Sequence, residues 1–186
     1  MRSHAWWYTA RAGGIVAWAL LSLAVVGGLQ LSTRLVRRPA PNWVLDVHRF
    51  VGGLSVAFVG LHLLGLALDP FIGYGVADLF VPFVSAYKPL PVALGVIGFY
   101  LLLAIEITSL AMRKMPRRTW HAVHLTSYAL FVVATLHGLT AGTDRNNVVF
   151  QWACLLVATL VLMMTLVRIW SPRRAARASV ARSDGT

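Results

Sequence analysis

The chain has little charge and almost no cysteine. Of its 186 residues only 12% are charged, and six Asp and Glu stand against 17 Lys and Arg. The one cysteine, Cys154, lies inside an apolar run, so a disulfide framework within the chain is excluded. No glycine-rich phosphate-binding loop follows a strand pattern, which argues against a nucleotide-binding domain in this sequence.

Apolar residues dominate instead. They make up 58% of the chain, and the mean hydropathy is +0.70, values that indicate a membrane protein. At about 20 residues per crossing, five windows are long enough to span a bilayer: 12–31, 47–68, 91–112, 119–140 and 148–170. Helices are favoured because the alternating segments of about 10 residues that a barrel needs are absent. The predicted fold is an all-α, five-helix transmembrane bundle over residues 1–170, followed by a basic, disordered cytoplasmic tail over 171–186.

Positive charge alternates along the chain and sets the predicted orientation. The basic residues assigned to the cytoplasmic side are Arg34, Arg37, Arg38, Arg49, Arg113, Lys114, Arg117, Arg118, Arg168, Arg173, Arg174, Arg177 and Arg182. The remaining four, Arg2, Arg11, Lys88 and Arg145, fall in the intervening segments. The positive-inside rule then predicts a multi-pass protein of the cell membrane with its N-terminus outside and its C-terminus in the cytoplasm. The net charge of +11 is then explained by topology and by anionic lipid headgroups at the cytoplasmic face. A nucleic-acid partner is therefore not expected.

The stretch 69–90 is apolar but is interrupted by Pro70, Pro82 and Pro89. Proline breaks the hydrogen-bond ladder of a helix interior, so a spanning helix is not expected there. We predict a segment that covers the outer end of the bundle or re-enters it.

Histidines lie in two of the five windows, and ionisable side chains at membrane depth suggest function. His48 and His62 are 14 residues apart, which places them within about 40° on one helix face and about 21 Å apart along it. His124 and His137 are 13 apart, a rise of about 19.5 Å but a phase difference of roughly 140°. A π-bulge, a kink, or cofactors offset around the helix must absorb this mismatch. Because both windows run in the same direction, depth pairs His62 with His137, and His48 with His124 or His121.

Two levels of facing imidazoles suit two six-coordinate b-type haems, with one histidine on each side of each iron. A tetrahedral zinc site would need ligands at one depth, three to five residues apart. Only His121 and His124 have that spacing. A haem-free transporter or assembly factor that handles protons or a metal ion through these histidines and Glu106 therefore remains the alternative.

Two segments carry a resemblance to a known family. They are HRFVGGLSVAFVGLH, from His48 to His62, and WHAVHLTSYALFVVATLHG, from Trp120 to Gly138. Over about residues 45–170 the chain resembles the ferric-reductase-like transmembrane domain of ferric reductases, NADPH oxidases and haem-binding subunits of methionine sulfoxide reductases. The resemblance implies transmembrane electron transfer through two haems, with His48, His62, His124 and His137 as axial ligands of the iron, and it favours His124 over His121.

The same resemblance implies partners. Relatives that complete their own reaction carry flavin and nicotinamide domains that are not seen in this sequence. We therefore expect an electron-transfer subunit that takes electrons from quinol or from a cytoplasmic flavoprotein holding FMN or FAD. The expected acceptor is ferric iron, oxygen or a periplasmic redox enzyme.

Several other residues have two interpretations each. Arg49 could bind a propionate of the inner haem or reach lipid headgroups. Glu106 could pair with Arg49 or Arg113, or relay protons. Phe58 and Phe131 could fill the gap between haems or simply pack. The glycines of the second window could admit a macrocycle or let helices pack closely.

Overall fold

The computed structural model describes residues 4–33, 42–71 and 73–183, with side chains described as far as Trp170. Every element in this part of the chain is helical. The elements are α1 (Ala5–Ser32), α2 (Asn42–Leu68), α3 (Val76–Phe80), α4 (Pro89–Leu110), η1 (Met112–Lys114), α5 (Arg117–Leu125), α6 (Ser127–Ala141), η2 (Thr143–Asn146) and α7 (Val148–Ser183).

Five helical stretches are long and apolar enough to cross a membrane, as predicted. They are α1, α2, α4, the consecutive pair α5 and α6, and residues Val148–Trp170 of α7. The chain is thus an all-helical, multi-pass membrane protein. One boundary differs from the sequence prediction: α1 begins at Ala5 rather than at residue 12, so Arg11 lies within the helix.

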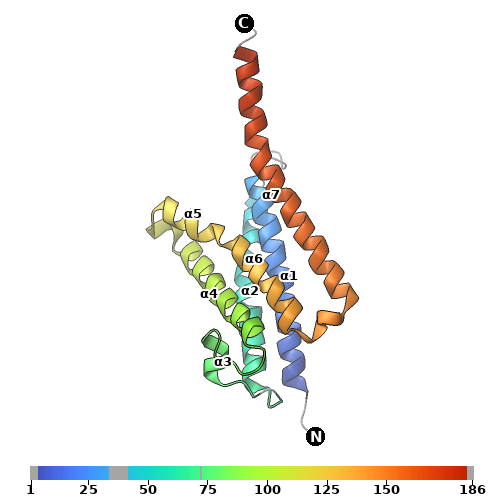
Figure 1. Cartoon of the computed structure of the whole chain (residues 1–186). Helices are drawn as coiled ribbons and strands as arrows, with labels where there is room; N and C mark the ends of the chain where they lie inside the picture. Colours follow the sequence, from blue (N-terminus) through green and yellow to red (C-terminus); the bar gives the residue numbers. More distant parts are fainter. Residues whose placement is uncertain (1–3, 34–41, 72, 184–186) are drawn as a thin grey trace.

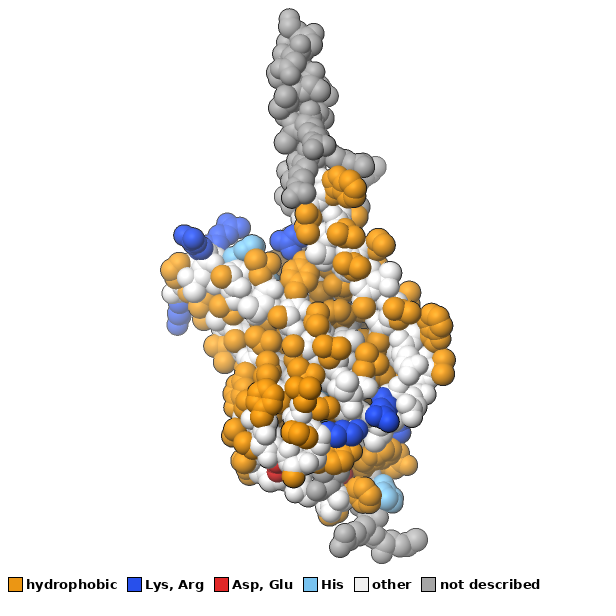
Figure 2. Space-filling view, viewed as in Figure 1, with side chains coloured by type: hydrophobic (Ala, Val, Ile, Leu, Met, Phe, Trp, Pro, Cys, Tyr) orange, Lys and Arg blue, Asp and Glu red, His pale blue; other side chains and the backbone are white. Residues whose placement is uncertain are grey.

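The surface has the character expected beside lipid. Large apolar side chains are exposed along the spans, among them Phe50, Leu110, Val149 and Leu156. Figure 2 shows hydrophobic side chains covering the middle of the bundle and Lys and Arg side chains gathered toward its ends. An aqueous monomer rarely exposes apolar surface this continuously, so the exposed belt is the face that lipid covers.

Helix α1 is the centre of the bundle. It packs along α2 over most of their length and also contacts α6 and α7, while α4 packs against α6 and α2. Figure 1 shows α7 on the far side of α1 from α4. The α1–α2 approach depends on glycine: a Cβ at Gly65 would lie 2.5 Å from the backbone nitrogen of Ala10. Small residues allow this backbone contact, which is how helices commonly associate in lipid.

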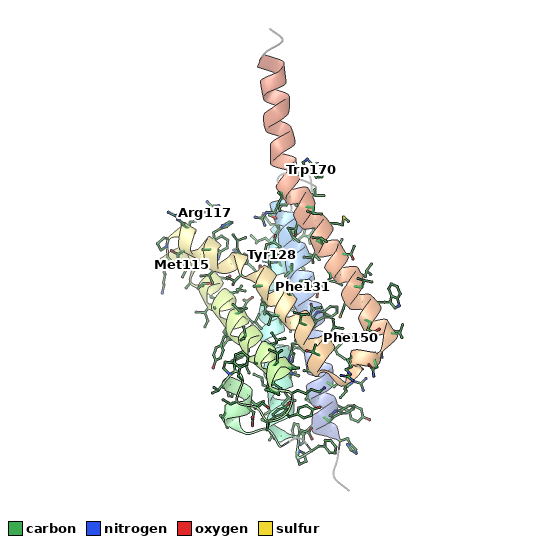
Figure 3. All side chains as sticks on the ribbon, in the orientation of Figure 1. Met115, Arg117, Tyr128, Phe131, Phe150 and Trp170 are labelled. Carbon is green, nitrogen blue, oxygen red and sulfur yellow. The ribbon has the colours of Figure 1, made fainter. Side chains whose placement is uncertain are left out.

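Two apolar clusters form the core. The first joins α1, α6 and α7 through Val25, Leu29, Phe131, Val161 and Met164. The second joins α4 and α6 through Leu102, Ile105 and Leu130, with side chains of α1 and α2 packed against it. Phe131 is 5% exposed and lies on α6 between its neighbouring helices (Figure 3), which supports the packing interpretation of this residue.

The stretch 69–90 is not a spanning helix, in agreement with the prediction. It contains the short helix α3 and lies at the N-terminal end of the bundle (Figure 1). The Tyr100 hydroxyl of α4 donates to the carbonyl of Phe80 at 2.9 Å. Lys88 adopts a left-handed conformation, φ 45°, directly before α4, and its ammonium group donates to the carbonyls of Thr140 and Ala141 at the end of α6. These bonds attach the segment to the bundle end.

Helix α7 continues to Ser183 and so runs past residue 170, where we predict the domain to end. The side chains beyond Trp170, and residues 184–186 altogether, lie outside the described part of the chain. The division into a domain of 1–170 and a disordered basic tail of 171–186 stays a prediction.

The Gly65 contact can be tested against a matched glycine on the same helix. We expect Gly65→Ala to lower the free energy of unfolding by about 1–3 kcal/mol, because the added methyl meets the α1 backbone. Gly53→Ala is the control, since a Cβ there meets nothing within 4 Å, and it should be neutral or stabilising by up to about 1 kcal/mol. Unfolding in mixed detergent micelles, followed by circular dichroism, measures both. Equal stabilities would contradict the packing proposed for α1 and α2.

Candidate functional site

The structure brings together both predicted histidine pairs. The rings of His48 and His124 face each other with centroids 6.0 Å apart and an interplanar angle of 73°. The rings of His62 and His137 do the same at 6.3 Å and 82°. Helix α2 supplies one imidazole of each pair, and the α5–α6 stretch supplies the other. Two pairs therefore lie at two depths along the bundle.

The structure places His124 and His121 differently. His124 is half-buried and faces His48, whereas His121 is exposed and its ring contact is with Trp120 at 6.1 Å. His121 therefore does not take part in the facing pair.

The phase mismatch between His124 and His137 is absorbed at Thr126. There the helix is interrupted between α5 and α6: the backbone N–H of Thr126 reaches the carbonyl of Val123 at 3.0 Å, and its hydroxyl donates to the same carbonyl at 2.7 Å. A bond to the third residue back winds the chain more tightly than an α-helix and turns its direction. Figure 1 shows α5 leaving the line of α6 at this point. Both histidines can then face α2.

Three of the four imidazoles are held by backbone carbonyls of neighbouring helices. The Nδ1 atom lies 2.9 Å from the Ala24 oxygen in His48, 2.7 Å from the Ala10 oxygen in His62, and 2.8 Å from the Pro91 oxygen in His137. A carbonyl can only accept, so Nδ1 carries the proton and donates it. The other nitrogen, Nε2, is left with a free lone pair, the arrangement typical of histidines that bind a metal.

His124 is held differently. Its Nδ1 is buried without a hydrogen-bond partner among the described residues. Its ring instead stacks on Trp120, one helical turn earlier, with centroids 5.2 Å apart and planes 24° from parallel. The stacked indole therefore orients the His124 imidazole, as a carbonyl acceptor does for the other three.

Glycines in α1 and α4 make room for three of the rings. A Cβ at Gly14 would lie 3.0 Å from Nδ1 of His62, at Gly28 3.3 Å from Cε1 of His48, and at Gly95 2.6 Å from Cε1 of His137. Sequence reasoning overlooked all three. A signal was available for the two glycines of α1, because the Gly13–Gly14 and Gly27–Gly28 pairs are spaced like His48 and His62, 14 residues apart.

Gly52 of α2 faces α4 and not a histidine. A Cβ at Gly52 would lie 2.6 Å from Oε1 of Glu106 on α4. The Glu106 carboxylate makes neither predicted ion pair, with Arg49 or with Arg113, since the ion pair found in the described part of the chain joins Arg11 to Asp144. Arg49 is exposed beside His48 and has no hydrogen bond or ion pair with the described residues, so its contact with a cofactor stays a prediction.

A cavity of about 260 Å³ opens beside the second histidine pair. Its wall includes His62 from α2, His137 from α6, Trp18 from α1 and Phe99 from α4. The cavity also reaches Tyr74 in the 69–90 segment. Burial raises the pKa of Tyr74 to about 12, with smaller contributions from Tyr87 and Asp78. The Tyr74 hydroxyl is therefore neutral at ordinary pH, and the cavity is mostly apolar with a polar end.

The residues fit a haem better than a cluster of metal ligands. A metal bound to two imidazoles through bonds of about 2 Å, with each ring centre about 1 Å further on, separates the centroids by about 6 Å. Both observed separations, 6.0 and 6.3 Å, agree with this value. In the described part of the chain no group of three or more His, Cys, Asp or Glu side chains could hold a metal ion. Two imidazoles at each level are the residues that would hold a haem.

The fold and the facing pairs define the class: a helical membrane bundle with paired intramembrane imidazoles. The family model described as "Ferric reductase like transmembrane component" matches residues 13–135, and the chain belongs to that family. The chain is similar to the haem-binding subunit MsrQ of protein-methionine-sulfoxide reductase from Caulobacter vibrioides, with 27% identity over 170 residues that cover 87% of this chain and 72% of the relative. No solved structure gives a significant match.

Proposed function

We propose that the protein carries electrons across the cell membrane through two b-type haems, each held between two histidines. His48 and His124 would ligate the inner haem, and His62 and His137 the outer one. The observation that carries the proposal is the pair of facing imidazole contacts at two depths. Family membership and the haem-binding relative support the same conclusion.

The haems supply the one-electron chemistry, and the protein controls where they sit and how they are ligated. The carbonyls of Ala24, Ala10 and Pro91 keep Nε2 of three histidines unprotonated and aimed into the bundle. The stack with Trp120 orients the fourth ring.

Aliphatic side chains from α2 and α6 lie between the two histidine levels along the chain and pack together. Leu130 lies between His124 and His137 in the chain, and Val56 and Val59 lie between His48 and His62, all in or against the cluster of Leu102 and Ile105. Phe131 also lies between His124 and His137 in the chain, but it packs in the cluster that joins α1, α6 and α7, so the proposal is direct transfer between the haems. The proposed role of the protein there is to set distance and to exclude water.

The basic segments support an orientation with the N-terminus outside and the C-terminus in the cytoplasm. The His48–His124 pair would then be the entry point and the His62–His137 pair the exit. Quinol or a cytoplasmic flavoprotein with FMN or FAD would donate the electrons. By analogy with the sulfoxide-reductase relative, the acceptor would be a periplasmic redox enzyme, with ferric iron or oxygen as the alternative acceptors.

Haem stoichiometry tests this proposal. The protein purified from haem-replete cells should show b-type bands in a reduced-minus-oxidised spectrum and contain two haems per chain. His62→Ala or His137→Ala should each reduce the content to one, because the outer pair is broken and the inner pair is intact. The same result is expected for His48→Ala and His124→Ala at the inner site.

His121→Ala is the matched control, since it removes a histidine of α5, the helix of His124, that lies outside both facing pairs. It should retain two haems. Absence of b-type bands in the unmodified protein, or retention of both haems in His124→Ala with loss in His121→Ala, would contradict the assignment.

Gly95→Ala tests the space reserved for the outer ligand. The added Cβ would overlap the His137 imidazole, so we expect haem binding at the outer site to weaken by about 1–3 kcal/mol. Gly98→Ala, one turn later, is the control, because its Cβ would make ordinary contacts of 3.7 Å with Leu130 and Val133. Haem retained during detergent washing of the two variants gives the comparison. Equal retention would show that Gly95 has no role at the ligand.

A further inference from the structure

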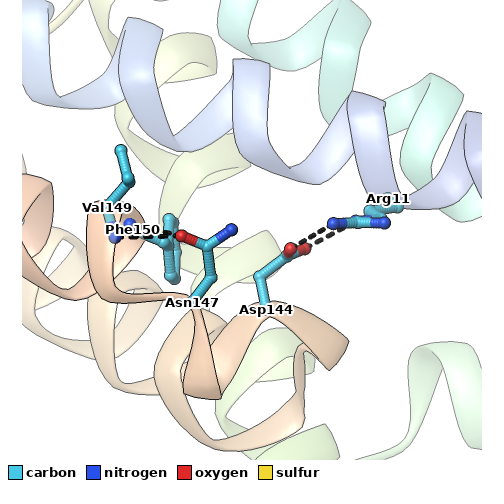
Figure 4. A network of polar contacts seen from close by, with 5 residues as sticks. All are labelled: Arg11, Asp144, Asn147, Val149 and Phe150. Atoms are coloured by element: carbon cyan, nitrogen blue, oxygen red, sulfur yellow. Dashed lines mark hydrogen bonds and ion pairs between the residues drawn. The ribbon is translucent and has the colours of Figure 1, made fainter.

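A cluster of Arg11, Asp144 and Trp7 lies at the cavity of the outer histidine pair. Neither the assignment of the histidine ligands nor the membrane topology explains why an ion pair is found there. Arg11 of α1 donates from Nε to Oδ2 of Asp144 at 2.7 Å and from Nη2 to Oδ1 of the same carboxylate. The guanidinium also lies over the ring of Trp7, 5.1 Å from its centroid. Figure 4 shows Arg11 reaching from α1 to Asp144 in η2.

The cluster belongs to the same site as the histidines. Arg11, Asp144, His62 and His137 all line the one cavity. Arg11 directly follows Ala10, whose carbonyl accepts the hydrogen bond from His62, and it is the one Lys or Arg side chain among the cavity's described lining residues. Any anionic group of a ligand held by the outer pair therefore has this single cation to meet inside the cavity.

The geometry leaves part of the guanidinium available. Asp144 occupies Nε and one N–H of Nη2, and Arg11 makes no further hydrogen bond with the described residues. A guanidinium has five N–H groups, so the two on Nη1 and one on Nη2 remain. The Arg11 side chain is 38% exposed, whereas Asp144 is only 10% exposed. The carboxylate is thus enclosed, and the free edge of the cation is the accessible side.

The other carboxylates of the cavity are engaged elsewhere. Asp69 accepts the backbone N–H of Phe71 at 3.1 Å, and Asp78 accepts that of Gly75 at 2.8 Å. Both therefore stabilise turns of the 69–90 segment and do not compete for Arg11. Asp144 alone pairs with it, holding the guanidinium along one edge.

We propose that Arg11 anchors a propionate carboxylate of the haem held by His62 and His137, with Asp144 and Trp7 keeping the guanidinium in position. A charge-assisted bond from a planar guanidinium to a carboxylate is strong and directional. The inference rests on the proposed function, because it presupposes a haem at the outer pair. The inference adds a role for Arg11, which would fix the rotational orientation of the haem between the two histidines.

A haem without carboxylates separates this role from a structural one. Apoprotein purified in detergent from haem-deficient cells, in the His48→Ala background so that only the outer pair binds, is titrated with iron protoporphyrin IX and with its dimethyl ester. We expect Arg11→Gln to weaken binding of the free acid about tenfold or more and to leave binding of the ester unchanged. The Soret band reports the affinity, so the readout does not depend on electron transfer.

Arg145→Gln is the matched control: it removes an exposed cation beside Asp144 that does not line the cavity, and it should leave both affinities unchanged. Asp144→Asn should keep the preference for the free acid, since Arg11 remains. If Arg11→Gln weakens binding of the free acid and of the ester equally, the ion pair only joins α1 to η2. If it weakens binding of neither, Arg11 does not contact the ligand. Both results overturn the anchor.

A second measurement covers the case in which the His48→Ala background does not fold. In the otherwise unmodified chain, Arg11→Gln should lower the reduction potential of one haem and leave the other, because a cation beside a haem carboxylate is lost. Unchanged potentials for both haems would overturn the anchor. If the unmodified protein binds neither porphyrin, the proposed function itself fails, and that result is distinct from every outcome that concerns Arg11 alone.

Discussion

The hydrogen bond from an imidazole Nδ1–H to a backbone carbonyl of the neighbouring helix is the interaction on which the site depends. It satisfies a polar ring at a depth where an unpaired donor costs several kcal/mol. It also decides which nitrogen points into the bundle. Ala10 and Ala24, which accept these bonds on α1, are spaced like the histidines of α2. The antiparallel α1–α2 pair therefore has one register that satisfies both rings.

The rest of the bundle follows from this register. Gly13 and Gly65 let the two backbones approach closely enough for the bonds to form. Once α2 is held, its two imidazoles face outward from α1 toward α5 and α6, and the tight turn at Thr126 directs the opposing rings to the same two depths. The Trp120 stack is the exception at the inner pair, where no carbonyl holds His124. The two pairs are therefore built differently, although both present the same facing geometry.

Much of this could be predicted from the sequence, and the failures have physical causes. The lengths of the apolar runs predicted five spans, and the rise per residue of a helix predicted that His62 and His137 lie at one depth. Both predictions succeed because they depend only on regular helix geometry within one segment. The turn at Thr126 could not be placed, since no proline or glycine marks it. Arg11 was assigned to a flanking segment because hydropathy windows end at a charge, whereas the helical hydrogen bonds of α1 continue to Ala5. The roles of Gly14, Gly28 and Gly95 require knowing which helices are neighbours.

Electron transfer across a sealed bilayer is the most direct test of the central claim, that the two imidazole pairs act in series. The protein would be reconstituted into liposomes with ferricyanide inside, and dithionite added outside. The account predicts haem-dependent reduction of the entrapped ferricyanide, and a fall to the rate of protein-free liposomes when either His48 or His62 is changed to Ala. Unmodified protein that conducts no faster than protein-free liposomes, or a single-pair variant that conducts as fast as the unmodified protein, would contradict it.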